Sequence, residues 1–98
     1  MTRVTPDLRR QVLQRDRACI LYVLEGPSHV CRDRWGVVHR STAIDMLSLE
    51  HVKDQPRMGV RAPSDPAHLV AMCHWANVNV PSKVQRDAIR KYLRRVTA

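Results

Sequence analysis

Two short apolar stretches decide the fold of this chain. The first is Met46-Leu47-Ser48-Leu49-Glu50-His51-Val52, and the second is His68-Leu69-Val70-Ala71-Met72-Cys73. The first alternates apolar and polar residues at its start, as a half-buried strand does, and the second fits the strand that returns beside it. The residues between them include Gly59 and three prolines, which favour a long loop. We therefore expect a hairpin of two strands.

Two helices are expected to follow the second stretch. A short helix begins at Cys73, and Pro81-Ser82 then breaks the chain and provides a new N-cap. A final helix of about 14 residues is expected over 82–96. Its apolar side chains at helical spacing are Val84, Ala88, Tyr92 and Val96.

A helix is also expected near the N-terminal end. Thr5-Pro6-Asp7 supplies an N-cap, a proline at the first helical position and an acidic first turn. Helical periodicity predicts that the inward face comprises Leu8, Val12 and Leu13. The outward face would comprise Arg9, Arg10 and Arg15. Residues 19–24 are apolar and fit either a helix or a strand. Residues 29–45 are expected to form an irregular connection.

The composition indicates one small domain, because 98 residues do not divide into two independent cores. Phe is absent and aromatic residues make up 4% of the chain, so a metal or an oligomer contact is expected to supplement the core. Trp35 and Trp75 are assigned to that core, and the alternative is that they are platforms on which bases stack. No apolar run approaches the roughly 18 residues of a membrane span, and the first residues lack the apolar stretch of a signal peptide. We expect a cytoplasmic protein that does not enter a membrane.

The charge balance favours a nucleic-acid partner. The chain has 17 basic and 9 acidic residues, a net charge of +8 and a pI near 10.5, which is the range of nucleic-acid-binding domains. One stripe of basic side chains along the final helix, at steps of three and four residues, comprises Lys83, Arg86, Arg90 and Arg94. These side chains are candidate phosphate contacts, and the alternative is an ordinary solvated face.

Three cysteines, Cys19, Cys31 and Cys73, cannot all pair within one chain. Disulfides are rare in reducing compartments, so the two alternatives are free buried thiols and metal ligands.

A set of polar residues on the expected hairpin and its helix resembles the motif of the HNH nuclease family. The set comprises Leu49-Glu50-His51-Val52, the stretch His68 to Cys73, and Asn77. In that family an acidic residue and a histidine end one strand, and an Asn-Leu-x-x-Leu-Cys-x-x-Cys-His pattern follows the loop. In the family pattern the final His lies nine residues beyond the Asn, and here Asn77 lies nine residues beyond His68. The resemblance covers about residues 46–84, and Arg15-Asp16-Arg17-Ala18-Cys19 resembles more weakly the start of the family's zinc knuckle.

The resemblance implies an α+β fold. Its core would be the small ββα-metal (His-Me finger) hairpin and helix, flanked by N-terminal and C-terminal helices in a single domain over 1–98. The chain departs from the family at several positions: His68 stands for Asn, Asn77 for His and Ala76 for a knuckle cysteine.

The resemblance also implies the roles of the hairpin residues. His51 would be the general base, since a neutral imidazole suits that task near pH 7. Glu50 and Asn77 would hold one divalent ion, Mg²⁺ or Mn²⁺ with Ni²⁺ or Zn²⁺ as alternatives, acting as a Lewis acid. His68 would bond across the hairpin and steady His51. Because neighbouring strand residues point to opposite faces, the strand must twist or end at Glu50 and His51.

A structural zinc is expected on Cys19, Cys31 and Cys73, because such sites are four-coordinate and rich in thiolates. The fourth ligand stays open between His29, His74 and His39. The alternative is that the three cysteines are small buried apolar residues.

The resulting expectation is a metal-dependent HNH endonuclease that hydrolyses DNA. Arg57 and Arg61 in the loop after His51 would grip the backbone beside the cut, or are plain solvated charges. By analogy with small members of the family, the chain would be phage-encoded, act in the host cytoplasm and meet packaging or terminase machinery. One alternative is a non-catalytic, zinc-stapled DNA-binding module, and another is a structural or packaging-accessory protein.

Overall fold

The computed structural model describes residues 4–52, 64–79 and 81–97. The helices and strands in chain order are α1 Pro6–Asp16, α2 Ile20–Glu25, β1 Cys31–Arg32, β2 Val38–His39, β3 Ser48–His51, β4 Leu69–Met72, α3 His74–Val78 and α4 Lys83–Val96. Single turns of 3-10 helix occupy Gly26–Ser28, Ile44–Met46 and Pro66–His68. The described strands form two antiparallel two-stranded sheets. This mixture confirms the expected α+β class.

The hairpin β3–β4 is present in the expected place. Ser48 pairs with Met72 and His51 with Leu69, and the Val52 amide extends the ladder to the His68 carbonyl at 2.8 Å. All four residues of β4 are buried, which explains why that stretch is apolar without alternation. Helix α3 follows β4 after one residue, so the chain has a hairpin followed by a helix.

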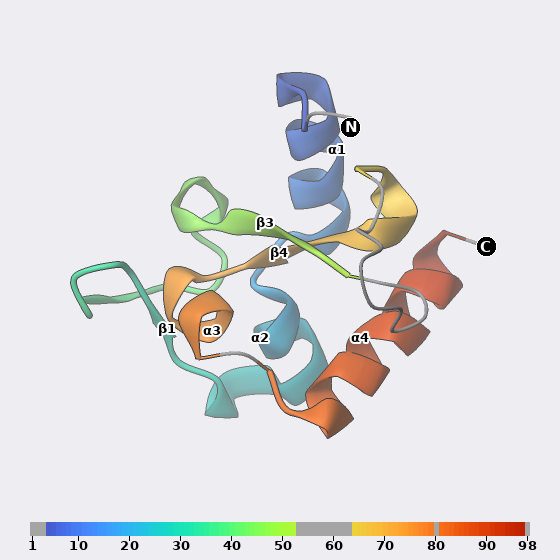
Figure 1. The fold of residues 1–98 in the computed structure, drawn as a ribbon. Coiled ribbons are helices and arrows are strands. Elements are labelled where there is room, and N and C mark those ends of the chain that lie inside the picture. The colour runs from blue at the N-terminus through green and yellow to red at the C-terminus, as the bar shows by residue number, and fades with distance from the viewer. Residues whose placement is uncertain (1–3, 53–63, 80, 98) are drawn as a thin grey trace.

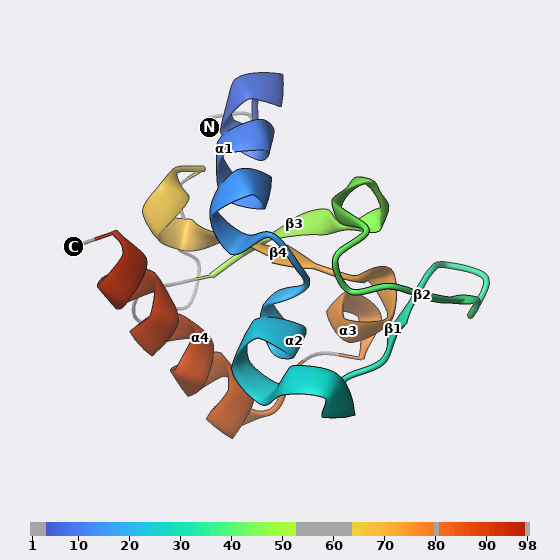
Figure 2. The ribbon, with the colours of Figure 1, turned by 180° about the vertical axis from the view of Figure 1, so that it is seen from behind.

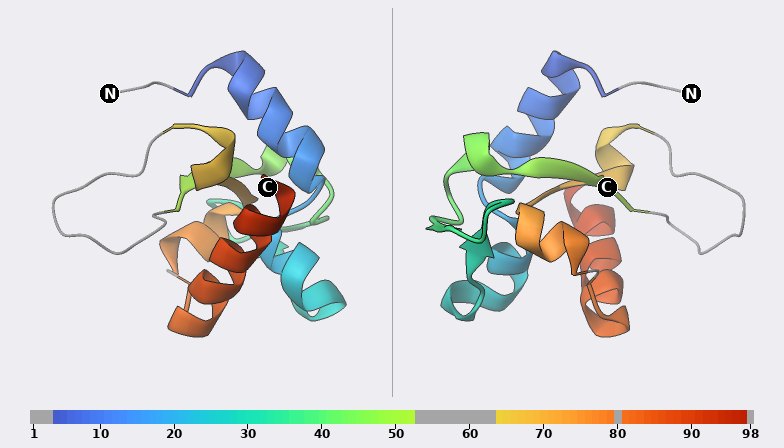
Figure 3. Two further views of the ribbon diagram at one scale, coloured as in Figure 1. Left: turned by 90° about the vertical axis from the view of Figure 1, so that its right-hand side faces the viewer. Right: turned by 60° about the vertical axis from the view of Figure 1, so that its left-hand side comes forward.

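The hairpin lies between helices. Helix α1 covers one side of it, and α2, α3 and α4 lie on the other (Figures 1 and 2). Two further views show the same layering (Figure 3). The largest fully buried side chains are Ile20, Leu69, Met72, Val12, Val70 and the three cysteines. The core is therefore centred on β4. Among the described residues, no helix has both the length and the apolar character needed to span a bilayer.

Helix α1 begins as predicted but places two of the three outward arginines differently. Arg9 is half-buried and donates to the Leu47 carbonyl at 2.8 Å, and Arg15 also turns inward. The Thr5 hydroxyl accepts from the Leu8 amide at 3.1 Å, and Pro6 opens the helix. Arg15 was expected to point outward, yet its side chain is only 17% exposed. Its guanidinium donates to the carbonyls of Pro66 at 2.5 Å and Leu69 at 2.6 Å. The outward assignment was wrong because β4 pairs with β3 alone in the described sheet, and Arg15 satisfies groups on its open edge.

Helix α2 resolves the secondary structure of residues 19–24, and helix α4 shows which of its side chains are buried. The apolar run after Cys19 is helical, as α2. Helix α4 starts at a capping box formed by Ser82 and Gln85. Its buried face is Ile89, Tyr92 and Leu93, whereas Val84 is 79% exposed and Val96 is 38% exposed. Of the apolar row Val84, Ala88, Tyr92 and Val96, only Tyr92 is therefore buried, because the helix packs through Tyr92 with its neighbour Leu93 and with Ile89.

The segment between α2 and β3 contains structure that its sequence did not predict. Strands β1 and β2 pair through Cys31 and His39 and form a small hairpin that projects from one side of the molecule (Figure 1). Trp35 in its turn is 78% exposed, and Trp75 on α3 is 47% exposed. Their assignment to the core was wrong, since neither lies where the helices and the β3–β4 hairpin pack together.

Candidate functional site

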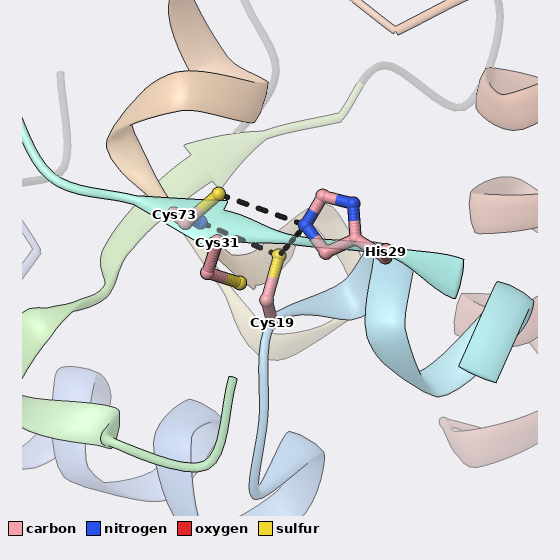
Figure 4. A group of neighbouring side chains, drawn as sticks. All are labelled: Cys19, His29, Cys31 and Cys73. Atoms are coloured by element: carbon pink, nitrogen blue, oxygen red, sulfur yellow. Dashed lines mark hydrogen bonds between the residues drawn. The ribbon is translucent and has the colours of Figure 1, made fainter. Parts of the chain in front are cut away.

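Three cysteines and one histidine from distant segments of the chain point toward one another (Figure 4). Cys19 is the N-cap of α2, Cys31 begins β1, and Cys73 is the N-cap of α3. His29 lies two residues before Cys31. The Sγ atoms and one ring nitrogen all lie within 4.8 Å of one another, and among the described residues this is the group of three or more His, Cys, Asp or Glu side chains that could hold a metal ion. All three cysteines are buried and free.

The spacing of these atoms fits a tetrahedral metal ion. A zinc ion with sulfur at about 2.3 Å and nitrogen at about 2.1 Å separates its ligands by roughly 3.6–3.8 Å. His29 Nε2 lies 3.5 Å from Cys19 Sγ and 3.7 Å from Cys73 Sγ. The four side chains are therefore already close to a closed ligand shell. A shell of four protein ligands is typical of structural rather than catalytic zinc.

Hydrogen bonds around the sulfur atoms favour the thiolate form of one of the three cysteines, Cys73. The Cys73 amide donates to Cys19 Sγ and the Ala76 amide to Cys73 Sγ, both at 3.4 Å. Ser41 Oγ lies 3.1 Å from Cys31 Sγ. Such outer contacts orient ligands and tune their basicity. The Cys19 thiol and the Ala76 amide hold the pKa of Cys73 down at about 4, against the opposing effect of its burial. The contact with Cys73 raises the pKa of Cys19, and burial raises that of Cys31.

The geometry chooses among the three histidines left open by the sequence. His29 contacts two of the sulfur atoms. His74 is exposed on α3, and His39 Nδ1 lies 2.9 Å from the Arg40 carbonyl. Neither belongs to the cluster. The cluster therefore comprises Cys19, His29, Cys31 and Cys73.

A second pair of predicted residues meets where β3 faces α3. The half-buried Glu50 carboxylate lies close enough to the Asn77 side chain for that amide to lower its pKa. Burial raises the pKa of Glu50 above its ordinary value, and His51 and Asn77 offset part of that rise. The two side chains offer oxygen atoms, which hard cations such as Mg²⁺ prefer. Because Mg²⁺ is usually bound by one or two such groups together with substrate phosphate, the pair fits a site that substrate completes.

His51 is exposed at the last position of β3. Its Nε2 lies 2.9 Å from the Ser64 hydroxyl. Strand β3 therefore ends at His51, as expected if Glu50 and His51 are to act together. His51 is close enough to Glu50 to lower the pKa of that carboxyl.

His68 has a different partner from the expected one. Its Nδ1 lies 2.6 Å from Asp65 Oδ1, so the ring is held within its own turn rather than across the hairpin to His51. Asp65 is also the N-cap of this 3-10 turn, since its carboxylate accepts from the Ala67 amide at 3.0 Å. An Asp before a proline is a local capping signal, and it identifies Asp65 from the sequence.

His68 lines a pocket together with two of the predicted arginines. The pocket has a volume of ≈130 Å³, and its lining residues are Val52, Ala67, His68, Arg90, Leu93, Arg94 and Thr97. Val52 is two residues from Glu50, and side chains at that spacing share one face of an extended chain. The pocket thus lies along the same face as the Glu50–Asn77 pair.

The basic stripe of α4 is less uniform than predicted. Asp87 contacts Lys83 at 3.1 Å and Arg90 at 3.0 Å, and the contact with Lys83 lowers the pKa of Asp87. The Arg90 side chain is only 18% exposed, whereas Arg86 and Arg94 are exposed. Arg57 and Arg61 lie outside the described residues.

Comparison of the chain with protein-family models, with curated proteins and with solved structures gives no match in any of the three.

Proposed function

We propose that this chain is a metal-dependent endonuclease of the HNH type that hydrolyses phosphodiester bonds in DNA. The observation that carries the proposal is the proximity of Glu50 on β3 and Asn77 on α3, close enough for Asn77 to lower the pKa of the Glu50 carboxyl. The two members of the metal-binding pair implied by the motif thus lie near each other in space, although 27 positions separate them in the sequence.

The residues divide the chemistry between them. His51 takes a proton from the attacking water, and the resulting hydroxide bonds to phosphorus as the bond to the leaving oxygen breaks. The Ser64 hydroxyl contacts Nε2 of that imidazole and helps to orient the ring. Glu50 and Asn77 would hold a divalent ion, which would supply positive charge to the phosphate and the leaving oxygen. His68, Arg90 and Arg94 present cationic and hydrogen-bonding groups to a neighbouring phosphate.

The cluster of Cys19, His29, Cys31 and Cys73 completes the proposal as a structural zinc site. Its four protein ligands leave no position for substrate, so the zinc acts on stability and not on the phosphate. Zinc bound there would join α2, β1 and α3, which come from three segments of the chain.

The test is cleavage of supercoiled plasmid by purified protein in Mg²⁺ or Mn²⁺. His51→Ala should abolish nicking while leaving the melting temperature and DNA affinity near those of the wild type, because a general base acts in the transition state. His74→Ala is the matched control, since it removes another exposed imidazole and should leave nicking unchanged. Nicking by His51→Ala at the wild-type rate would remove the proposed role of His51.

The cysteine and histidine cluster favours a second candidate function, a zinc-stapled DNA-binding module without catalysis. The same assay separates the two candidates. Protein that binds DNA and carries zinc, yet leaves the plasmid intact at every concentration of Mg²⁺ and Mn²⁺, would be the binding module.

A further inference from the structure

The turn of the β1–β2 hairpin is closed by several hydrogen bonds. One oxygen of the Asp33 carboxylate accepts from the amides of Trp35 at 2.9 Å and Val37 at 3.0 Å. The Asp33 amide donates to the Val37 carbonyl at 3.0 Å. Gly36 takes a φ of +80°, which favours glycine. These contacts give the turn one defined conformation.

This turn holds an aromatic ring out into solvent. Trp35 is 78% exposed, and its neighbours Val37 and Val38 are 60% and 55% exposed. The Arg34 guanidinium lies 5.4 Å from the centre of the indole ring, so it covers at most one face of that ring. Grouped exposed apolar side chains mark interaction sites, and a rigid turn that presents them indicates a specific one.

The charge of the hairpin identifies the partner as a nucleic acid. Arg32, Arg34 and Arg40 lie in or beside it, and its acidic residue, Asp33, is engaged by backbone amides of the turn. An aromatic ring flanked by arginines is complementary to a base flanked by phosphates. The chain as a whole carries a net charge of +8, which adds to the attraction.

The base of the hairpin is anchored to the core. Cys31 in β1 and the preceding His29 belong to the buried cluster of possible metal ligands, and the Cys19 amide donates to the Ser41 carbonyl just after β2 at 3.0 Å. The position of the turn that carries Trp35 is therefore set before a partner arrives, which reduces the entropy lost on binding.

We propose that Trp35 stacks on an unpaired base of DNA, with Arg34 and Arg32 at the adjoining phosphates. Bases within an intact duplex are stacked on both faces, so they have no face free for the indole ring, whereas bases in single strands do. The inference rests on the proposed action on DNA and adds a substrate class, namely duplexes that carry a single-stranded end, flap or bulge.

The experiment compares the binding of two labelled DNAs by fluorescence anisotropy. One is a fully paired duplex, and the other is the same duplex with a single-stranded overhang. The protein carries His51→Ala, so that cleavage does not disturb the measurement. Trp35→Ala should weaken binding to the overhang DNA about tenfold, which is the effect of removing one aromatic ring from beneath a base, and leave binding to the paired duplex unchanged. Trp35→Phe keeps a ring and should retain most of the affinity.

Trp75→Ala is the control for the loss of an exposed tryptophan elsewhere, and it should bind both DNAs as the parent does. Because Trp35 is largely exposed, its removal should also leave the melting temperature unchanged. In a Trp75→Phe protein, where Trp35 is the remaining tryptophan, single-stranded DNA should quench the emission.

Equal affinity of the parent and Trp35→Ala for the overhang DNA would overturn the proposal, as would unquenched Trp35 emission. A hairpin that serves a protein partner would give that same result. Failure of the nuclease proposal is seen separately, as absence of metal-dependent nicking by the wild-type protein, because the binding comparison requires no cleavage.

Discussion

The buried carboxylate of Asp16 at the end of α1 accepts a hydrogen bond from the Tyr92 hydroxyl of α4 at 2.5 Å. The same carboxylate accepts from Arg15 Nε at 2.7 Å and from the Ala71 amide of β4 at 2.9 Å. A buried charge is tolerated when its hydrogen-bonding capacity is filled and a counter-charge lies beside it. Asp16 meets both conditions. Its hydrogen bonds join α1 and α4 to strand β4 of the hairpin. The Arg-Asp pair that the sequence associated with a zinc knuckle therefore holds the helices to the hairpin.

Tyr92 should make stability depend on alkaline pH. Burial and the contact with Asp16 raise its pKa from 10.0 to about 12. Because the folded state raises this pKa, the contribution of the neutral hydroxyl is fully present below pH 10 and is lost as the pH rises through about 12. Tyr92→Phe should cost about 1–3 kcal/mol at pH 7 and flatten the loss of stability between pH 10 and 12. Denaturant unfolding at each pH measures both effects, and Tyr22→Phe is the control. The same alkaline slope in Tyr92→Phe and the parent would contradict this account.

The cysteine and histidine cluster should carry about one zinc per chain. His29→Ala and Cys73→Ser should each lose the metal and lower the melting temperature by on the order of 15 °C or more, because zinc bound only by the folded state contributes to folding. The measurement is elemental analysis of protein purified without added metal, together with melting curves with and without a chelator. His74→Ala, which alters the neighbour of Cys73, should keep its zinc. Zinc-free protein of full stability would mean that the cysteines serve only to pack the core.

Glu50→Gln and Asn77→Ala should each raise the concentration of Mg²⁺ needed for half-maximal nicking, and excess metal should restore part of the rate. Each change weakens or removes one hard oxygen ligand, so the defect lies in metal binding. The readout is the midpoint of a metal titration in the plasmid assay. Glu25→Gln, which alters an exposed carboxylate on α2, should leave that midpoint in place. An unmoved midpoint in both hairpin variants would exclude these residues as ligands.

The exposed arginines of α4 should contribute affinity for every duplex alike. Replacing Arg86 and Arg94 with Glu should lower affinity regardless of sequence and reduce the slope of log K against log salt by about 0.9 for each phosphate that is no longer neutralised. Arg10→Glu on α1 is the matched control, because that side chain is also exposed. Binding isotherms at several salt concentrations give both quantities. A slope unchanged in the double variant would show that this face of α4 does not meet phosphate.

Features encoded by neighbouring residues were predictable from the sequence. The cap at Thr5 and the break at Pro81-Ser82 set helix starts, because capping depends on a few adjacent backbone groups. The two strands of the β3–β4 hairpin were visible because their apolar patterns have strand length and turn-forming residues lie between them. The three cysteines were recognised as candidate ligands from residue type alone.

Features that depend on which segments meet were decided by the tertiary structure. Cys19 and Cys73 are 54 residues apart, and the choice of His29 over His74 and His39 follows from the packing of β1 against α3. No pattern among neighbouring residues predicts the packing of β1 against α3. The same holds for Arg15, which turns inward to the edge of β4, and for Trp35, which the β1–β2 turn carries away from the core. The sequence by itself determined helices α1, α3 and α4, the β3–β4 hairpin and the types of ligand available, because those are set by spacing and propensity within a few residues. Only the tertiary structure decided which side chains converge and which stay in solvent, because burial and metal geometry are properties of contacts between distant segments.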